Sequence, residues 1–145
     1  MSRKDKFHEA VKRALEKEDW LITHDPFIIQ ISETVKLKID LGAETVIAAQ
    51  RNTDKIAVEV KNFATDSEIS EFHTALGQYL NYLQALETKE PDRVLYLAVP
   101  QETYNDFFQI PFIQNSLKRH SVNLISYSPL QETIVQWINC KTIEK

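Results

Sequence analysis

Two acids and a lysine are spaced as a metal-dependent phosphodiester-cleaving site requires. Glu59 and Lys61 belong to the segment 55–62 (KIAVEVKN), in which apolar and polar residues alternate. In a strand, successive side chains point to opposite faces, so Glu59 and Lys61 share one face. The segment 35–41 (VKLKIDL) alternates in the same way and carries Asp40 on its polar side. A neighbouring strand would bring Asp40 to Glu59.

These residue types suit hydrolysis assisted by Mg²⁺ or Mn²⁺. Mg²⁺ takes oxygen ligands, usually one or two carboxylates, with water and substrate phosphate completing its shell. We expect Asp40 and Glu59 to supply the carboxylates and the carbonyl of Val60 a third oxygen. The ion would polarise the phosphodiester and lower the pKa of a bound water. Lys61 would orient the nucleophile or stabilise the charge of the transition state. The alternative is that Glu59 and Lys61 form an ordinary ion pair on a solvated strand, worth about 1 kcal/mol at most.

The chain resembles the PD-(D/E)XK nuclease-like superfamily and, more closely, the XisH family of fdxN element excision controlling factors. The resemblance runs over nearly the whole chain. The segments that carry it most specifically are 19–26 (DWLITHDP), 39–44 (IDLGAE), 56–63 (IAVEVKNF), 75–80 (ALGQYL) and 94–100 (VLYLAVP). Ile39 stands before Asp40 where the superfamily name expects proline.

The resemblance implies a set of site residues. The superfamily places an acid on a first helix, then Asp, then Glu-x-Lys, and then a helix that often carries Gln. Those places are taken here by Glu9, Asp40, Glu59, Lys61 and Gln78. Glu9 lies on the polar side of its helix, which weakens its assignment as a ligand, and Gln78 is expected to face either a sheet edge or water. Glu44 would become a third acidic group if Gly42 marks a bulge or turn.

The resemblance also implies a function and partners. It predicts a factor that controls excision of a DNA element by a separate site-specific recombinase, alongside a XisI-like partner protein. Two alternatives accompany a catalytic role: a regulator that does not cut, and a scaffold whose acidic pocket is only structural. We also expect a homodimer. The apolar residues around Pro111 are either core or a dimer contact.

The composition of the chain limits the classes of protein and of site that are possible. With 145 residues, 26% charged and 43% hydrophobic, the chain is expected to fold as one domain spanning 1–145. No apolar run is long enough for a membrane span or a signal peptide, which predicts a cytoplasmic protein. The single Cys140 permits no internal disulfide and gives no zinc site. Only Gly42 and Gly77 occur, so a phosphate-binding glycine loop is excluded, and Gly77 inside a helix suggests close packing.

The net charge of −4 argues against a protein that coats DNA along its whole surface. Affinity for nucleic acid comes largely from Lys and Arg that displace counterions from phosphates. Contact with DNA is therefore expected to be local or to run through a partner. The candidate patches are Lys36 with Lys38, Arg51 with Lys55 near the proposed site, and 118–120 (KRH), which is more simply read as solvated charge.

Periodicity predicts an α/β fold, with a restriction-endonuclease-like mixed sheet flanked by helices. Helical spacing of apolar residues covers 2–18 and 65–88, the latter opening with a capping-box pattern at Thr65 and Glu68. Strands are predicted at 27–31, 35–41, 43–50, 55–62, 94–99 and 122–127. Helical segments are predicted at 101–119, interrupted at Pro111, and from Pro129 to Asn139. The early strands should pair antiparallel as hairpins, and the two late buried strands should pair parallel.

Overall fold

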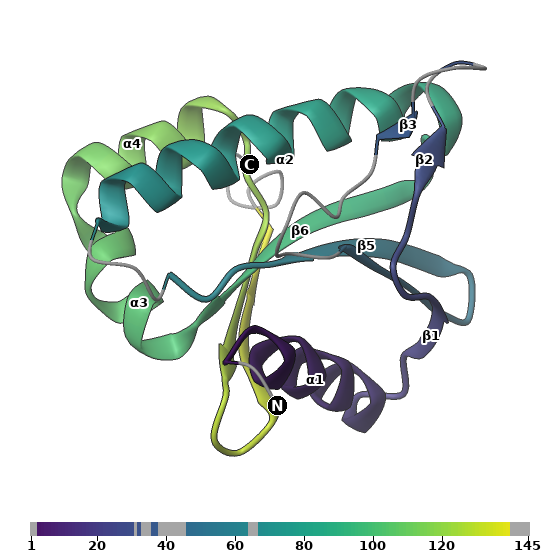
Figure 1. The fold of residues 1–145 in the computed structure, drawn as a ribbon, viewed down its shortest axis with the longest axis horizontal. Helices are drawn as coiled ribbons and strands as arrows, with labels where there is room; N and C mark the ends of the chain where they lie inside the picture. The colour runs from purple at the N-terminus through teal and green to yellow at the C-terminus, as the bar shows by residue number, and fades with distance from the viewer. Residues whose placement is uncertain (1–2, 31, 33–35, 38–45, 64–66, 140–145) are drawn as a thin grey trace.

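The computed structural model describes residues 3–30, 32, 36–37, 46–63 and 67–139. Its elements form an α/β fold of three layers, with α1 on one face of a central sheet and α2 and α4 on the other (Figure 1). The helices are α1 Arg3–Lys17, α2 Glu68–Lys89, α3 Gln101–Asn105 and α4 Pro111–Arg119, with a 3₁₀ helix at Phe107–Gln109. The strands are β1 Leu21–His24, β2 Ile29–Gln30, β3 Lys36–Leu37, β4 Val46–Arg51, β5 Asp54–Val60, β6 Arg93–Pro100, β7 Leu124–Ser128 and β8 Thr133–Ile138.

The sheet is mixed, with the strand order β1-β4-β5-β6-β7-β8. A hairpin joins β4 to β5, and β1 adds antiparallel to the outer side of β4. The central pairs β5–β6 and β6–β7 are parallel, because the segments that contain α2 and α4 carry the chain back across the sheet. The antiparallel pairing predicted between the strands at 43–50 and 55–62 and the parallel pairing predicted for the two late strands are thus confirmed, whereas the described parts of the four early strands do not lie in one sheet. Strands β2 and β3 form a separate small antiparallel pair.

Alternation along the strands divides the core into two clusters. On the α2 side, β5 contributes Ala57 and β6 contributes Leu95 and Leu97 to a cluster built around Phe72 and Tyr79 of α2. On the other side, a second cluster fills the space between the sheet and α1; from β5 and α1 it contains Ile56, Val58, Val60, Ala10, Val11 and Leu15. The apolar stripe predicted for the first helix is therefore the buried one. Strand β6 is buried on both faces over most of its length, as its near-continuous apolar run predicts.

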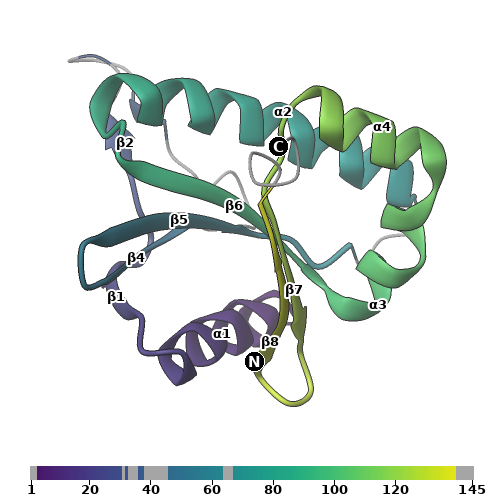
Figure 2. The same cartoon turned by 180° about the vertical axis from the view of Figure 1, so that it is seen from behind.

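The prediction of a C-terminal helix from Pro129 is wrong. Residues 129–132 form the turn of a hairpin, and β8 returns antiparallel to β7 (Figure 2). The turn closes with the Glu132 amide donating to the Ser128 carbonyl at 2.8 Å, and Glu132 adopts a positive φ of 57°. The β-branched and aromatic residues of 133–138 favour a strand, which outweighs the preference of Pro129 for a first helical turn.

Two smaller predictions also need correction. Residues 21–24 form the edge strand β1, although they were not predicted as a strand. Most side chains of β1 are exposed, so no alternation reveals it. Helix α2 is capped by Ser67, whose hydroxyl accepts from the Ser70 amide at 3.3 Å, so the cap lies two residues later than the predicted Thr65.

No helix in the described ranges combines the length and the apolar character needed to cross a bilayer.

Candidate functional site

Glu59 and Lys61 lie at the carboxyl end of β5, in the middle of the sheet. Glu59 is in register with Val46 of β4 and with Leu97 of β6. Lys61 follows the last residue of β5, and its amide donates to the Ala98 carbonyl at 3.0 Å. Since Ala57 belongs to the α2-side cluster, alternation places Glu59 and Lys61 on that same side. The predicted shared face is confirmed.

Lys61 is held between two polar side chains. Its Nζ lies 3.6 Å from Glu59 Oε2 and donates to Gln78 Oε1 of α2 at 2.5 Å. Both charged side chains are almost fully buried, with exposed fractions of 4% for Lys61 and 1% for Glu59. The reading of an ordinary solvated pair is therefore wrong, since burying two charges costs several kcal/mol per ion and requires mutual pairing and further hydrogen bonds.

Gln78 comes from a different element. It lies in the interior of α2, one residue before the buried Tyr79, and is half-buried at the edge of the helix face that packs on the sheet. Tyr79 fixes this face because its hydroxyl donates to the Leu95 carbonyl of β6 at 3.0 Å. A long helix anchored in this way delivers the Gln78 amide to Lys61. Of the two orientations expected for Gln78, the structure has the one that faces the sheet.

Other predicted site residues are not gathered at this point. Asp40 and Glu44 lie outside the described residues, and the described chain resumes at Val46, the register partner of Glu59. Glu9 lies on α1, across the sheet from α2, with its carboxylate 3.7 Å from Lys12 Nζ (Figure 1). The Val60 side chain is buried towards α1, so only its backbone would be available to a ligand on the Lys61 side.

The oxygen ligands that the described residues supply beside Lys61 meet only part of what a Mg²⁺ site requires. Glu59 supplies one carboxylate, and Mg²⁺ is commonly held by one or two carboxylates with the remaining ligands from water and substrate. Within the described residues, no three His, Cys, Asp or Glu side chains come together as a metal cluster. Glu59 is thus the carboxylate that the described residues place beside Lys61, and a second carboxylate for a metal ion would have to come from elsewhere in the chain.

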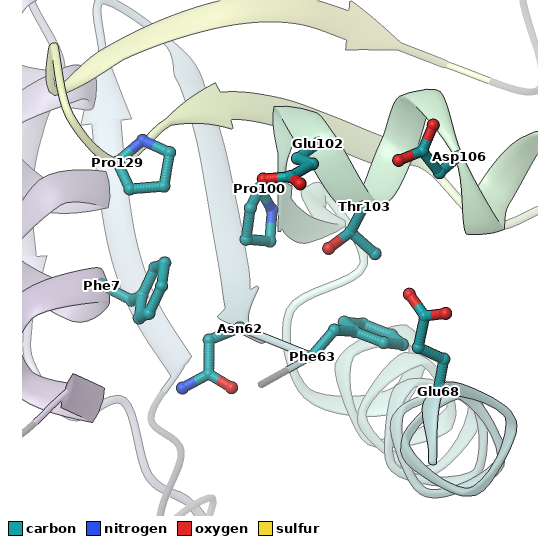
Figure 3. A pocket seen from close by; sticks show the side chains of 9 residues that line it. All are labelled: Phe7, Asn62, Phe63, Glu68, Pro100, Glu102, Thr103, Asp106 and Pro129. Carbon is teal, nitrogen blue, oxygen red and sulfur yellow. The ribbon is translucent and has the colours of Figure 1, made fainter. Parts of the chain in front are cut away.

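A pocket of about 380 Å³ opens beyond the carboxyl ends of β5, β6 and β7, where Asn62, the residue after Lys61, lines it. Figure 3 shows Phe7 of α1 and Glu68 of α2 on different sides of it, with Glu102 and Thr103 of α3 between. Its lining is Phe7, Asn62, Phe63, Glu68, Pro100, Glu102, Thr103, Asp106 and Pro129. Three of these residues are acidic and none is Lys or Arg, so the pocket repels an anion such as a phosphate.

This pocket was not predicted from the sequence. The available signal was topological, because ligands in open α/β sheets bind beyond the carboxyl ends of parallel strands. Asn62, Pro100 and Pro129 occupy those ends.

The expectation that Arg51 and Lys55 lie near the site is wrong. They lie at the turn end of the β4–β5 hairpin, where Arg51 pairs with Asp54, whereas Glu59 pairs with Val46 at the other end. Six residues of strand separate Lys55 from Lys61, which corresponds to roughly 20 Å. Of the other basic patches, Lys118 and Arg119 are exposed in the last turn of α4. Lys38 lies outside the described residues.

The chain thus has an α/β fold with a mixed sheet, in which a buried acid and lysine at the carboxyl end of β5 meet a half-buried glutamine of α2. The family model of the XisH protein matches residues 1–135. The chain belongs to the XisH family.

Two solved structures resemble the chain over most of its length. One is an XisH family protein from Nostoc punctiforme PCC 73102, with 51% identity and a TM-score of 0.85, covering 93% of this chain and 100% of that one. The other is a fdxN element excision controlling factor protein from Anabaena variabilis, with 52% identity and a TM-score of 0.85, covering 93% of this chain and 99% of that one. No curated protein matches the chain.

Proposed function

We propose that the protein controls excision of a DNA element and carries a metal-dependent phosphodiesterase site of the PD-(D/E)XK kind. The observation that carries the catalytic part is the buried Lys61, held between Glu59 at 3.6 Å and Gln78 at 2.5 Å. The family membership and the excision-control description of the Anabaena variabilis protein support the regulatory part.

The assignment of roles follows from the chemistry of each side chain. The Lys61 ammonium, which lies 3.6 Å from Glu59 Oε2, would stabilise the negative charge that develops on the scissile phosphate. Gln78 would fix the direction of the Lys61 ammonium by accepting one of its protons. Glu59 would both neutralise Lys61 in the resting protein and serve, with Asp40, as a carboxylate ligand.

Mg²⁺ or Mn²⁺ held by Asp40 and Glu59 would polarise the phosphodiester and help neutralise the developing charge. The Val60 carbonyl is the third oxygen that we assign to it, and Glu9 has at most a supporting role from its position on α1. What supports the inclusion of Asp40 is that it precedes Val46, the neighbour of Glu59 in the sheet, by only six positions in the sequence.

The negative charge of the chain indicates that it needs partner proteins to bind DNA. The chain has a net charge of −4, and the pocket beyond the carboxyl ends of β5, β6 and β7 is lined by three acids, so affinity for DNA by this chain alone is expected to be weak. We propose that a XisI-like protein and the site-specific recombinase system bring DNA to the site, and that the protein acts as a homodimer.

The same acidity supports a second candidate function, in which the protein regulates excision through its XisI-like partner without cutting DNA.

Cleavage assays with matched variants test the proposal. Linear, branched and supercoiled DNA would be incubated with Mn²⁺, with and without the partner protein. We expect nicking by the wild type, none by Lys61→Ala, and unchanged nicking by Lys118→Ala, which removes an exposed lysine of α4. If no substrate is nicked under any of these conditions, the catalytic part is rejected and the regulatory function remains.

Metal binding is tested separately by calorimetric titration of Mn²⁺. The wild type is expected to bind more tightly than Glu59→Gln or Asp40→Asn, because each variant removes one carboxylate. Indistinguishable isotherms for all three proteins would reject this pair as the ligands.

A further inference from the structure

A second pocket, of about 330 Å³, lies on the α1 side of the sheet at the starts of β5 and β6. Helix α1 ends at Lys17 and does not extend over this part of the sheet (Figure 1). The lining is Trp20, Arg51, Asp54, Lys55, Ile56, Val94, Tyr96 and Trp137. The volume is at the lower end of the range typical of small-molecule sites.

Aromatic rings form much of the wall. Trp137 meets Tyr96 edge to face, with centroids 5.1 Å apart, and is tilted against Trp20 at 5.9 Å. Its orientation is fixed because its Nε1 donates to Glu18 Oε1 at 3.0 Å. Trp20 is only 5% exposed and forms part of the core, whereas Tyr96 and Trp137 are half-buried and retain exposed ring surface. The pocket therefore offers rigid aromatic rings to a planar ligand.

Positive charge adjoins the rings. The Arg51 guanidinium lies 4.5 Å from the centre of the Trp20 ring, held by a hydrogen bond from its Nη1 to the Glu18 carbonyl at 3.1 Å. Lys55 Nζ lies 3.8 Å from Asp92 Oδ2, but their side chains are 37% and 69% exposed, so this pair is screened by water and contributes little. The lining thus carries the cations Arg51 and Lys55 and the acid Asp54, with the carboxylates of Asp92 and Glu18 next to Lys55 and Trp137.

The charges of this pocket differ from those of the pocket beyond the carboxyl ends of β5, β6 and β7. That pocket has three acids and no Lys or Arg, whereas this one combines two cations with three aromatic rings. Of the two pockets, this one is therefore the more favourable for a planar ligand that carries an anionic group.

We propose that this pocket binds an unpaired nucleobase together with its phosphate, in single-stranded nucleic acid or as a free nucleotide. The base would stack on Tyr96 and Trp137, and the phosphate would pair with Lys55 and Arg51. A base inside a duplex has both faces covered by its neighbours, so stacking on the protein selects unpaired bases. The inference is independent of the proposed phosphodiesterase, because the Glu59–Lys61 pair lies on the other side of the sheet.

Fluorescence anisotropy with labelled oligothymidylate of about a dozen nucleotides tests this binding. EDTA is included to prevent cleavage, so binding is measured apart from any nuclease activity. We expect Tyr96→Leu to weaken binding about tenfold or more and Tyr96→Phe, which keeps the ring, to bind like the wild type. Lys55→Ala should weaken binding about three- to tenfold and lower the slope of log affinity against log salt by about 0.7.

Matched controls are Tyr104→Leu and Lys118→Ala, which make the same kinds of change away from this pocket and should leave binding unchanged. Should Tyr96→Leu unfold, as judged by circular dichroism, Lys55→Ala and Tyr96→Phe still decide the matter. Competition by adenosine monophosphate would identify a free nucleotide as a sufficient ligand, and its failure to compete would assign the site to the strand. The proposal is overturned if neither probe binds, if a hairpin duplex binds as tightly, or if Lys55→Ala and Tyr96→Leu have no effect.

Discussion

Lys61 and Gln78 meet across the boundary between β5 and α2, with Lys61 Nζ donating to Gln78 Oε1 at 2.5 Å. The contact joins a strand end to a helix that Tyr79 anchors to β6 through its hydroxyl and the Leu95 carbonyl. Gln78 is thus in a position to set the direction of the Lys61 ammonium. The same ammonium faces Glu59 at 3.6 Å, so one cation connects the helix and the acid.

Removing the Gln78 acceptor should impair catalysis more than folding. In Gln78→Leu, the Lys61 ammonium loses its orienting partner, and we expect the Mn²⁺-dependent nicking rate to fall about 10- to 100-fold, as for other residues that position catalytic groups. Gln78→Glu retains an acceptor at the same place and should restore much of the rate. Gln84→Leu, an exposed glutamine on the same helix, should have no effect. Equal rates for Gln78→Leu and the wild type would remove Gln78 from the site.

The buried pair of Glu59 and Lys61 should destabilise the fold when only one charge is removed. Lys61→Met leaves the Glu59 carboxylate without this cation in a buried position, which we expect to cost about 3–5 kcal/mol in the free energy of unfolding. The double variant Glu59→Leu with Lys61→Met should recover most of that loss, because replacing a buried pair by apolar side chains of similar volume is often neutral or stabilising. Urea denaturation of the wild type, Glu59→Leu, Lys61→Met and the double variant completes a double-mutant cycle.

An exposed pair provides the control for this cycle. Lys55 and Asp92 are 3.8 Å apart but largely solvated, so a double-mutant cycle on them should give about 1 kcal/mol at most. A coupling energy between Glu59 and Lys61 as small as that would contradict their burial.

Alternation in the sequence was sufficient to predict the face that Glu59 and Lys61 share, because a period of two fixes the side of the sheet once one neighbour is known to be buried. The buried run of β6 was predictable for a similar reason. The contact of Lys61 with Gln78 was not, since it depends on the rotation of α2 about its axis. That rotation is set by the hydrogen bond of Tyr79 to β6, a contact between residues 16 positions apart in the chain.

The largest error is the helix predicted from Pro129 to Asn139, and the pairing of β8 with β7 in a hairpin explains it. Residues 133–138 pair with β7 over five registered positions, and this tertiary pairing determines β8. Pro129, which suits a helix start, suits the preceding turn equally well. The misplacement of Arg51 and Lys55 has a simpler cause, because the rise along a strand already separates Lys55 from Lys61 by roughly 20 Å.

Asp25 should make stability depend on pH in acid. Burial raises the pKa of its carboxyl, but hydrogen bonds from Lys12 and His8, each at 2.8 Å, lower it more, so the pKa lies below its ordinary value. A carboxyl with a depressed folded-state pKa stabilises the fold above its unfolded pKa of about 3.9 and loses that contribution as pH falls through the folded pKa. The wild type should therefore exceed Asp25→Asn in stability at pH 6, and the difference should shrink below about pH 4.

Thermal denaturation across pH measures this difference, with Asp92→Asn as the control. Asp92 is 69% exposed, and its variant should run parallel to the wild type at every pH. A constant difference between the wild type and Asp25→Asn from neutral pH down to strongly acid pH would contradict the lowered pKa of Asp25.

Gly77 should be a site where alanine stabilises the protein. The sequence suggests close packing at this glycine, but a Cβ built there meets no atom within 4 Å, so that expectation is wrong. Since Gly77 is exposed in the interior of α2, Gly77→Ala should gain about 0.5–1 kcal/mol from helix propensity alone, or roughly 3 °C in Tm. Differential scanning calorimetry measures the shift. Gly77→Pro is the opposite control, because it breaks the helix and should lower Tm strongly. A lower Tm for Gly77→Ala would mean that the space beside α2 is filled in solution.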